Sequence, residues 1–243
     1  MSKGIFIVGT DTDVGKTIIS AGIMYLLRLN GYNATYFKGA LSGAIEENDK
    51  LIPGDTKEVC ELSNLKEEYS DITPYIYKTP VSPHLASKLE NNIINKEVML
   101  DKYKILKKKY NYIVAEGSGG IICPLIDTKE SIYLLEDFIK DLGMNVVIVT
   151  RADLGTINHT ILTVKYIQGL GIKIKGIIIN GYKNNILCDD NIKIIKKLSN
   201  LPIIGIVNHI DNIHDENLRK DNIKLEIERS IDIRKIISIM DEI

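Results

Sequence analysis

The chain has 243 residues, of which 44% are hydrophobic, and this size and apolar content are typical of one α/β domain with a substantial core. Its 31 lysines and arginines are balanced by 32 aspartates and glutamates, and the lack of a basic excess argues against nucleic acid as a partner. No apolar stretch approaches the ~20 residues that cross a bilayer, and the first strand leaves no room for a signal peptide, so we expect a cytoplasmic protein without a membrane partner.

A glycine-bearing turn between the first predicted strand and the first predicted helix is the strongest functional signal. The apolar run Gly4–Val8 leads into GTDTDVGKT (9–17), and apolar residues at helical spacing follow from Ile18 to Leu29. In this context a Gly-Lys-Thr ending is typical of a P-loop, whose backbone N–H groups and helix N-terminus bind phosphate. We therefore expect Lys16 to reach the terminal phosphates of a nucleoside triphosphate and the Thr17 hydroxyl to ligate Mg²⁺.

The second predicted strand, Ala34–Phe37, is followed by polar residues that suit the same phosphate site. Lys38 lies at the end of this strand, where an ammonium group would stabilise charge on a transferred phosphoryl group. The ordinary alternative is an exposed lysine at a strand terminus. An acidic magnesium ligand is also expected, and the sequence leaves it open between Asp49 and Asp55. Asp55 equally fits the N-cap of a helix.

The third predicted strand, Tyr112–Ala115, ends in the sequence EGSGG (116–120). Glu116 is placed at the strand end to bind Mg²⁺ through its carboxylate, and the glycines that follow allow the backbone to approach phosphates closely. The alternative for Glu116 is a surface acid in a glycine turn.

Three further strands and the intervening helices complete an α/β pattern. Near-continuous apolar runs predict strands at Asn145–Thr150, Lys175–Ile179 and Ile203–Val207, each buried on both faces. Helices are predicted at 129–142, 156–170 and 190–198, a polar loop at 208–222, and a C-terminal helix at 231–240. The expected fold is a single-domain, three-layer α/β/α fold of residues 1–243 with a mostly parallel, doubly wound sheet, as in P-loop NTPases. Ligands of such sheets bind at the carboxyl ends of the strands.

Taken together, these segments resemble the dethiobiotin synthetase family. The matching residues, in the order of the family, are GTDTDVGKT (9–17), Lys38 with Ser42-Gly43, Ser82-Pro83-His84, EGSGG (116–120), LGTINHT (154–160) and Asn180. Five residues separate Gly9 from Gly15, one more than in the usual P-loop, and the family shows this longer gap. The resemblance runs from Gly9 to Asn180 and so covers most of the chain.

The resemblance implies an ATP-dependent ring closure in biotin biosynthesis. Enzymes of the family convert 7,8-diaminopelargonic acid, CO₂ and MgATP into dethiobiotin, ADP and phosphate through a carbamate and a carbamic-phosphoric anhydride. Lys16 and Lys38 would be catalytic, Asn180 would read the adenine, and Thr17, Asp55 and Glu116 would hold Mg²⁺. The implied ATP site comprises Asp13, Val14, Gly15, Lys16, Thr17, Ile18, Asp55, Glu116, Gly117, Ser118, Gly119, Asn180, Gly181, Asn208, His209 and Ile210.

The resemblance also implies a diamine site and a homodimer. Ser42 would contact the diamine, and the remote carboxylate of the diamine would bind at the helix N-terminus near Thr156. In the family this second segment reaches the substrate from the neighbouring subunit. The substrate-binding residues of the segment would be Leu154, Gly155, Thr156, Ile157 and Asn158. Gly39 and Asn208 stand where the family usually has proline, and we expect Gly39 to loosen its loop.

Two other P-loop classes fit the sequence less well. A partitioning-type ATPase that dimerises on ATP would lack Lys38 and the Ser82-Pro83-His84 segment, and often carries a membrane helix or a basic surface. An amide-forming P-loop enzyme usually adds a glutamine-hydrolysing domain with a reactive cysteine, for which this chain has no room.

Overall fold

The computed structural model describes residues 1–210 and 215–243, and this part of the chain contains a main sheet of seven strands. Six strands are parallel in the order β12-β11-β10-β1-β7-β2, and the short β13 pairs antiparallel with β1. All six strands predicted from the sequence are confirmed. The seven strands of the main sheet, including β13, which was not predicted, are Lys3–Gly9 (β1), Ala34–Phe37 (β2), Tyr112–Gly120 (β7), Val146–Thr150 (β10), Ile174–Tyr182 (β11), Ile203–Asn208 (β12) and Asp241–Glu242 (β13).

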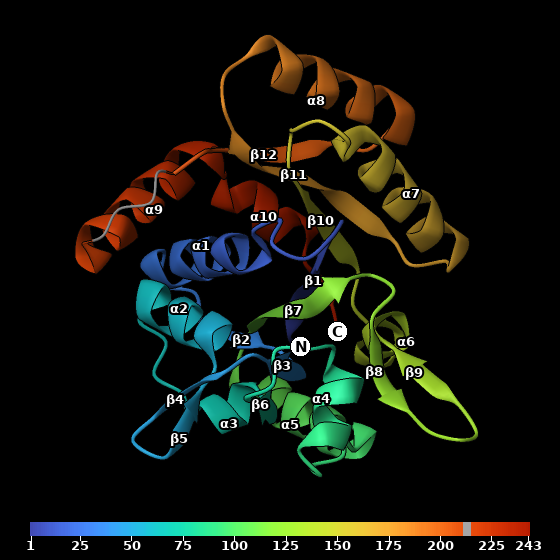
Figure 1. The fold of residues 1–243 in the computed structure, drawn as a ribbon. Coiled ribbons are helices and arrows are strands. Elements are labelled where there is room, and N and C mark those ends of the chain that lie inside the picture. The colour runs from blue at the N-terminus through green and yellow to red at the C-terminus, as the bar shows by residue number, and fades with distance from the viewer. Residues whose placement is uncertain (211–214) are drawn as a thin grey trace.

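Helices cover both faces of this sheet, which explains the near-continuous apolar strands. Helices α1, α9 and α10 lie over one face, and α5, α6 and α7 lie over the other (Figure 1). Helix α2 packs on α1, and α8 packs on α7. The helices are α1 (Lys16–Leu29), α2 (Gly54–Ser63), α3 (Tyr69–Ile72), α4 (Pro83–Leu89), α5 (Lys96–Lys109), α6 (Leu135–Leu142), α7 (Thr156–Gly169), α8 (Ile186–Ser199), α9 (Glu216–Ser230) and α10 (Ile233–Ile239). The predicted three-layer α/β fold is confirmed.

Three two-stranded sheets flank the main sheet in the described chain, and none of them was predicted. Strand β3 (Ala40–Ser42) pairs in parallel with β6 (Tyr75–Tyr77) and so fixes the segment after Lys38. The other two sheets are hairpins, formed by β4 (Ile45–Glu47) with β5 (Lys50–Ile52) and by β8 (Pro124–Asp127) with β9 (Ile132–Leu134).

Several predicted boundaries were wrong, each for a local reason. The helix expected at 129–142 begins only at Leu135, because Thr128 and Ser131 form the turn of the β8–β9 hairpin. The loop expected at 208–222 contains the start of α9, which Asp215 caps by accepting a hydrogen bond from the Leu218 N–H. The part of that predicted loop at 211–214 lies outside the described residues.

Gly39 is packed rather than loose. A Cβ added at this position would lie 2.8 Å from Cε1 and Cζ of Phe138 and 3.0 Å from Sδ of Met99. The ring of Phe138 also lies 6.1 Å from that of Phe37, at the end of β2. The absence of a side chain at Gly39 therefore lets helix α6 approach the connection that carries Lys38, which corrects the expectation of a loosened loop.

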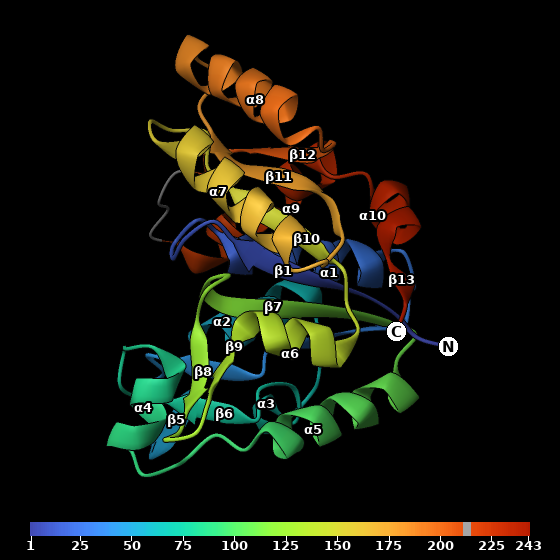
Figure 2. The same cartoon turned by 90° about the vertical axis from the view of Figure 1, so that its right-hand side faces the viewer.

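The two chain ends meet at the end of the sheet opposite to the carboxyl ends of the strands (Figure 2). The N–H of Ile243 donates to the carbonyl of Ser2 at 3.0 Å. Within the described residues, no helix combines the length and apolar character needed to cross a membrane.

Candidate active site

The loop between β1 and α1 adopts a conformation that only a few residue types allow. Gly15 is the N-cap of α1 and has a left-handed φ of 94°. Asp13 also has a positive φ, of 57°, which aspartate tolerates better than most residues. At Gly9, a Cβ would lie 2.7 Å from the carbonyl oxygen of Asp11. The two glycines that define the P-loop therefore meet real steric requirements, and the loop presents the N-terminus of α1 to the carboxyl edge of the sheet.

Beside this loop, one ammonium group bridges two carboxylates. Nζ of Lys38 lies 2.6 Å from Oδ2 of Asp55 and 2.8 Å from Oε1 of Glu116. The Thr17 hydroxyl donates to the same Oε1 at 2.9 Å, and the Tyr36 hydroxyl donates to Oε2 at 3.1 Å. Lys38 and Glu116 are 3% and 1% exposed, so this ion pair is buried. An exposed lysine at position 38 and a surface acid at position 116 are thereby ruled out.

Different elements bring these groups together. Lys38 directly follows β2, and its backbone N–H donates to Ile72 at 2.8 Å. Glu116 lies inside β7, opposite Ile7 of β1, because the strand continues through the EGSGG sequence to Gly120. Asp55 lies in the first turn of α2. Parallel strands therefore deliver side chains that are distant in sequence to one edge of the sheet.

The two acidic alternatives that the sequence left open occupy different places. Pro53 is the N-cap of α2, so the proposed N-cap role of Asp55 was wrong, and its carboxylate bonds Lys38 instead. Asp49 lies in the turn between β4 and β5, with a φ of 61°. Only Asp55 joins the P-loop cluster.

The charges in the cluster shift one another in defined directions. Burial lowers the pKa of Lys38, but the carboxylates of Glu116 and Asp55 more than offset this, so its pKa lies above the ordinary lysine value. Burial raises the pKa of Asp55, yet Lys38 and the Thr17 hydroxyl hold it below the usual range. Burial lowers the pKa of Lys16 despite the opposing effect of Glu116. The direction of the pKa shift of Lys38 favours its charged form at neutral pH.

A cavity of about 450 Å³ opens above the P-loop and this cluster. Its walls combine the backbone of the loop with two lysines, three acidic residues and several hydroxyl groups, which suits a polyphosphate with its cation better than an apolar ligand. The lining residues are Thr12, Asp13, Gly15, Lys16, Thr17, Ile18, Lys38, Leu41, Ser42, Asp55, Glu116, Ser118 and Gly119.

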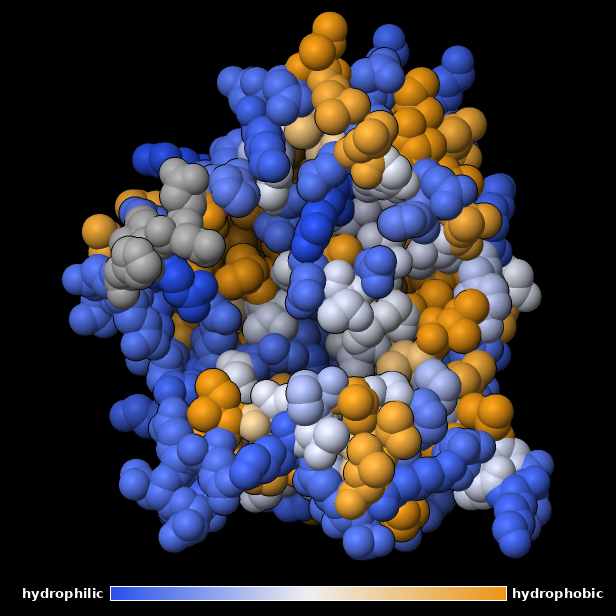
Figure 3. All heavy atoms as spheres, in the orientation of Figure 1, coloured by the Kyte–Doolittle hydropathy of each residue, from blue (hydrophilic) through white to orange (hydrophobic). Residues whose placement is uncertain are grey.

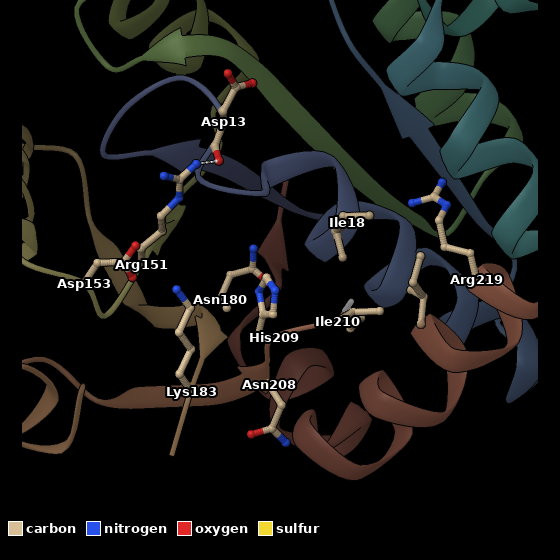
Figure 4. Close-up of a pocket in the computed structure, with 12 residues that line it drawn as sticks. Asp13, Ile18, Arg151, Asp153, Asn180, Lys183, Asn208, His209, Ile210 and Arg219 are labelled. Atoms are coloured by element: carbon tan, nitrogen blue, oxygen red, sulfur yellow. Dashed lines mark hydrogen bonds between the residues drawn. The ribbon is translucent and has the colours of Figure 1, made fainter. Parts of the chain in front are cut away.

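A second cavity, of about 390 Å³, lies on the other side of the P-loop and shares Asp13 and Ile18 with the first. Figure 3 shows this face of the molecule hollowed near its centre, with hydrophilic residues around the hollow. Figure 4 shows the lining side chains coming from the P-loop, from the start of α1 (Ile18), from the ends of β10, β11 and β12, and from α9. They are Asp13, Ile18, Arg151, Asp153, Asn180, Gly181, Lys183, Asn208, His209, Ile210, Arg219 and Ile223.

The cavities contain most but not all of the residues proposed from the sequence. Within the described chain, Val14 and Gly117 line neither cavity: Val14 is buried, and a Cβ at Gly117 would meet Leu135 at 2.6 Å. The segment Leu154–Asn158 also lies outside both cavities, and Leu154 is 88% exposed. Thr156 is buried, with its hydroxyl bonded to the Arg151 carbonyl at 2.6 Å.

Sequence reasoning missed several residues of the site. Tyr36 lies two residues before Lys38 in the apolar strand β2, where nothing in the sequence marks its hydroxyl as a partner of Glu116. Arg219 comes from α9, in a stretch read as a loop. Arg151 was recognisable only by its position after the strand Asn145–Thr150, and no role was assigned to it.

Comparison with known proteins matches a family model and several named relatives. A family model described as an AAA domain matches residues 3–217. A protein named ATP-dependent dethiobiotin synthetase BioD from Clostridium kluyveri is 53% identical over 243 residues, covering 100% of both chains. A protein of the same name from Clostridium novyi is 59% identical over 222 residues, covering 90% of this chain and 93% of the relative.

Solved structures share the architecture at much lower identity. The MinD cell division protein of Aquifex aeolicus aligns with a TM-score of 0.60 at 15% identity, covering 100% of this chain and 99% of that one. A ParA family ATPase from Chlorobium tepidum aligns with a TM-score of 0.56 at 16% identity, covering 98% and 94%. These likenesses concern the fold alone.

Proposed function

The chain belongs to the ATP-dependent dethiobiotin synthetase family, and from this premise we propose that the P-loop cavity is its active site, with Lys16 and Lys38 as catalytic residues. The enzyme is an ATP-dependent dethiobiotin synthetase, a ligase of biotin biosynthesis that forms carbon–nitrogen bonds. The observation that carries the assignment of the site is the Lys38 ammonium held between Asp55 and Glu116, next to the P-loop.

The reaction closes a five-membered urea ring on a diamine. One amine of 7,8-diaminopelargonic acid takes up CO₂ and loses a proton, which gives a carbamate. A carbamate oxygen forms a bond to the γ-phosphorus of ATP as the bond to ADP breaks. The second amine attacks the carbonyl carbon, loses a proton and displaces phosphate. Because both amines belong to one molecule, this last step has a high effective molarity.

In this scheme the cluster acts by its charge. Carbamate and γ-phosphate are both anionic, so their approach requires fixed positive groups. Lys38 supplies one such group, since Asp55 and Glu116 keep it protonated. Lys16, whose Nζ donates to the Asp11 carbonyl at 2.9 Å, is a second cation within the loop. Tyr36 and Thr17 hold the Glu116 carboxylate in place through hydrogen bonds to its two oxygens.

The side chains of the cluster suit a magnesium ion. Within the described residues, no group of three or more His, Cys, Asp or Glu side chains could hold a metal. Magnesium at nucleotide sites, however, uses one or two carboxylates together with hydroxyl and phosphate oxygens. Asp55, Glu116 and Thr17 provide such hard oxygen atoms, so we assign them as its ligands. When bound, the ion would neutralise phosphate charge during the transfer.

We assign the adenosine part of ATP to the second cavity and the diamine to Ser42 and the start of α7. The second cavity adjoins the P-loop and contains Asn180, Gly181, Asn208, His209 and Ile210. Ser42 lines the P-loop cavity. The segment Leu154–Asn158 lies outside both cavities of its own subunit and is largely exposed, which supports a homodimer in which it contacts the diamine of the partner.

Substitution of Lys38 tests the assignment of the site. In Lys38→Met we expect the kcat of dethiobiotin formation from the diamine, bicarbonate and MgATP to fall about 100- to 1,000-fold, as when one preorganised charge-stabilising group is removed. Mass spectrometry of the product measures the rate. Lys104→Met is a matched control, because Lys104 forms an exposed ion pair with Asp101 on α5. A Lys38→Met enzyme with a near-normal kcat would remove Lys38 from the catalytic residues.

A further inference from the structure

Two successive carbonyl groups of the P-loop are held from outside the loop. Arg151, which follows β10, donates a guanidinium hydrogen bond to the Asp13 carbonyl (Figure 4). Asn180, in β11, donates from Nδ2 to the Val14 carbonyl at 3.1 Å. Side chains at the ends of two neighbouring strands therefore form hydrogen bonds with adjacent peptide groups at the turn that leads into α1.

The backbone conformation of this turn is one that hydrogen bonds from outside the loop would stabilise. Asp13 has a φ of 57°, a left-handed value that aspartate tolerates better than most residues but that still costs some free energy. Gly15 has a φ of 94°, and a Cβ there would lie only 2.0 Å from Nδ2 of Asn180. The carboxamide of Asn180 thus occupies the space that the glycine leaves free. Outside contacts stabilise a loop geometry that the chain would not prefer by itself.

Threonine hydroxyl groups hold the backbone of Arg151 in place. The Thr156 hydroxyl donates to the Arg151 carbonyl at 2.6 Å. The Thr150 hydroxyl lies 3.0 Å from that of Thr156 and 3.2 Å from that of Thr10, at the start of the P-loop. The end of β10 is therefore tied to the loop both at Thr10 and, through Arg151, at Asp13.

We propose that Arg151 and Asn180 form a clamp that holds the P-loop in its phosphate-binding geometry, which makes both of them positioning residues of the ring-closing reaction. In a trans peptide group the C=O and the following N–H point in opposite directions. Holding the carbonyls of Asp13 and Val14 therefore also orients the N–H groups of Val14 and Gly15. Those are groups of the kind that a P-loop directs at phosphate. The proposal rests on the proposed function, since it concerns the same site.

Hydrogen exchange of the protein without nucleotide tests the clamp directly. We expect Arg151→Met and Asn180→Ala each to speed the exchange of backbone amides in a peptide that covers residues 9–17. Arg229→Met is the matched control: Arg229 is exposed in the last turn of α9, and its loss should leave this exchange unchanged. Unchanged exchange in both Arg151→Met and Asn180→Ala would overturn the clamp, whatever their effect on activity.

Binding of tripolyphosphate with Mg²⁺ separates the clamp from contacts with the base. Because this probe has no base, a role of Asn180 only in reading adenine predicts normal affinity for tripolyphosphate in Asn180→Ala. The clamp instead predicts an affinity about five-fold weaker, the usual effect of losing one hydrogen bond.

Arg151→Lys keeps the positive charge at position 151 but lacks the guanidinium group. The clamp therefore predicts that Arg151→Lys behaves like Arg151→Met, with weakened tripolyphosphate affinity and fast amide exchange in residues 9–17. Full restoration of both affinity and slow exchange by Arg151→Lys would contradict the clamp. A wild-type protein that binds neither tripolyphosphate nor ATP would instead contradict the proposed function, and the exchange experiment would still decide the clamp.

Discussion

The ammonium group of Lys38 contacts two carboxylates that differ sharply in exposure. The side chain of Glu116 is fully buried, whereas that of Asp55 is 41% exposed. Removing Lys38 would leave Glu116 buried without a counter-charge, which is strongly destabilising. The contact with Asp55 is partly screened by solvent and contributes less. The two carboxylates therefore share one lysine but differ in what they contribute to stability.

The lowered pKa of Asp55 gives a testable dependence of stability on pH. A carboxylate whose pKa is lower in the folded than in the unfolded state stabilises the fold above its unfolded pKa of about 4, and this contribution is lost as the pH falls through the folded value. We expect Asp55→Asn to lower the free energy of unfolding by about 1 kcal/mol at pH 7, with a difference from wild type that shrinks below about pH 4. Urea denaturation across this range measures it.

Asp49→Asn provides the control for this experiment, because Asp49 lies in the β4–β5 turn, away from Lys38. Its free energy of unfolding should follow that of the wild type at every pH. A loss in Asp55→Asn that stayed constant down to the most acidic pH at which the protein remains folded would show that the Lys38 contact does not depend on the charge of Asp55.

At the scale of elements, the start of α7 is more exposed than the rest of the site, and contacts within the chain do not account for this. Leu154 is 88% exposed, Gly155 has a φ of 90° with nothing within 4 Å of where a Cβ would lie, and Asn158 is also exposed. The free N–H groups at a helix start favour an anion such as a carboxylate. A partner subunit that brings its diamine to this segment would account for the exposure of the segment and would supply a carboxylate to the N–H groups of the helix start.

Complementation between inactive variants tests the shared site. Asn158→Glu should block the substrate carboxylate by charge repulsion, and Lys38→Met should block the chemistry. In a mixed dimer, one site would combine the intact Lys38 of one subunit with the intact α7 start of the other. We expect co-expression at equal levels to recover about one quarter of wild-type activity, since half the dimers are mixed and each has one working site. Dethiobiotin formation measures the recovery.

A pair of variants in the same half of the site provides the control. Lys38→Met co-expressed with Thr17→Ala should recover no activity, because every site in the mixed dimer then carries one of the two changes. If Lys38→Met and Asn158→Glu also recovered none, while the purified mixture still contained dimers, the α7 start would not act across the interface.

The sequence predicted the elements that carry strong local signals and missed those that depend on tertiary contacts. The six buried strands and the P-loop were recognisable because apolar runs and glycine positions are local patterns. The short β3 and β6 were not, since three-residue strands such as Ala40–Ser42 are defined by their partners. Lys38 and Glu116 were both selected from strand ends, yet their direct contact depends on the register between β1, β2 and β7.

At the scale of the whole molecule, the sheet order explains how one site draws on most of the chain. The central strand β1 has β10 on one side and β7 on the other, so the P-loop adjoins both Glu116 and Arg151. The C-terminal β13 returns to pair with β1. Because both ends of the chain join the same sheet, we infer that residues 1–243 form a single domain.

The fold by itself does not distinguish a synthetase from an ATPase, since the MinD cell division protein and a ParA family ATPase share this architecture. The difference lies in what the γ-phosphate is transferred to: a carbamate in ring closure, or water in simple hydrolysis. The buried Lys38 cluster beside the P-loop is our reason for placing carbamate phosphorylation in this cavity.

Transfer of an oxygen label from bicarbonate to phosphate tests this central claim most directly. The enzyme is mixed with the diamine, MgATP and ¹⁸O-labelled bicarbonate, and phosphate and dethiobiotin are analysed by mass spectrometry before the label exchanges with water. Attack by a carbamate oxygen predicts one ¹⁸O in each phosphate released and one in each urea carbonyl formed. Release of unlabelled phosphate would contradict the phosphorylation of a carbamate at this site, whether labelled dethiobiotin is formed at the same time or no dethiobiotin is formed at all.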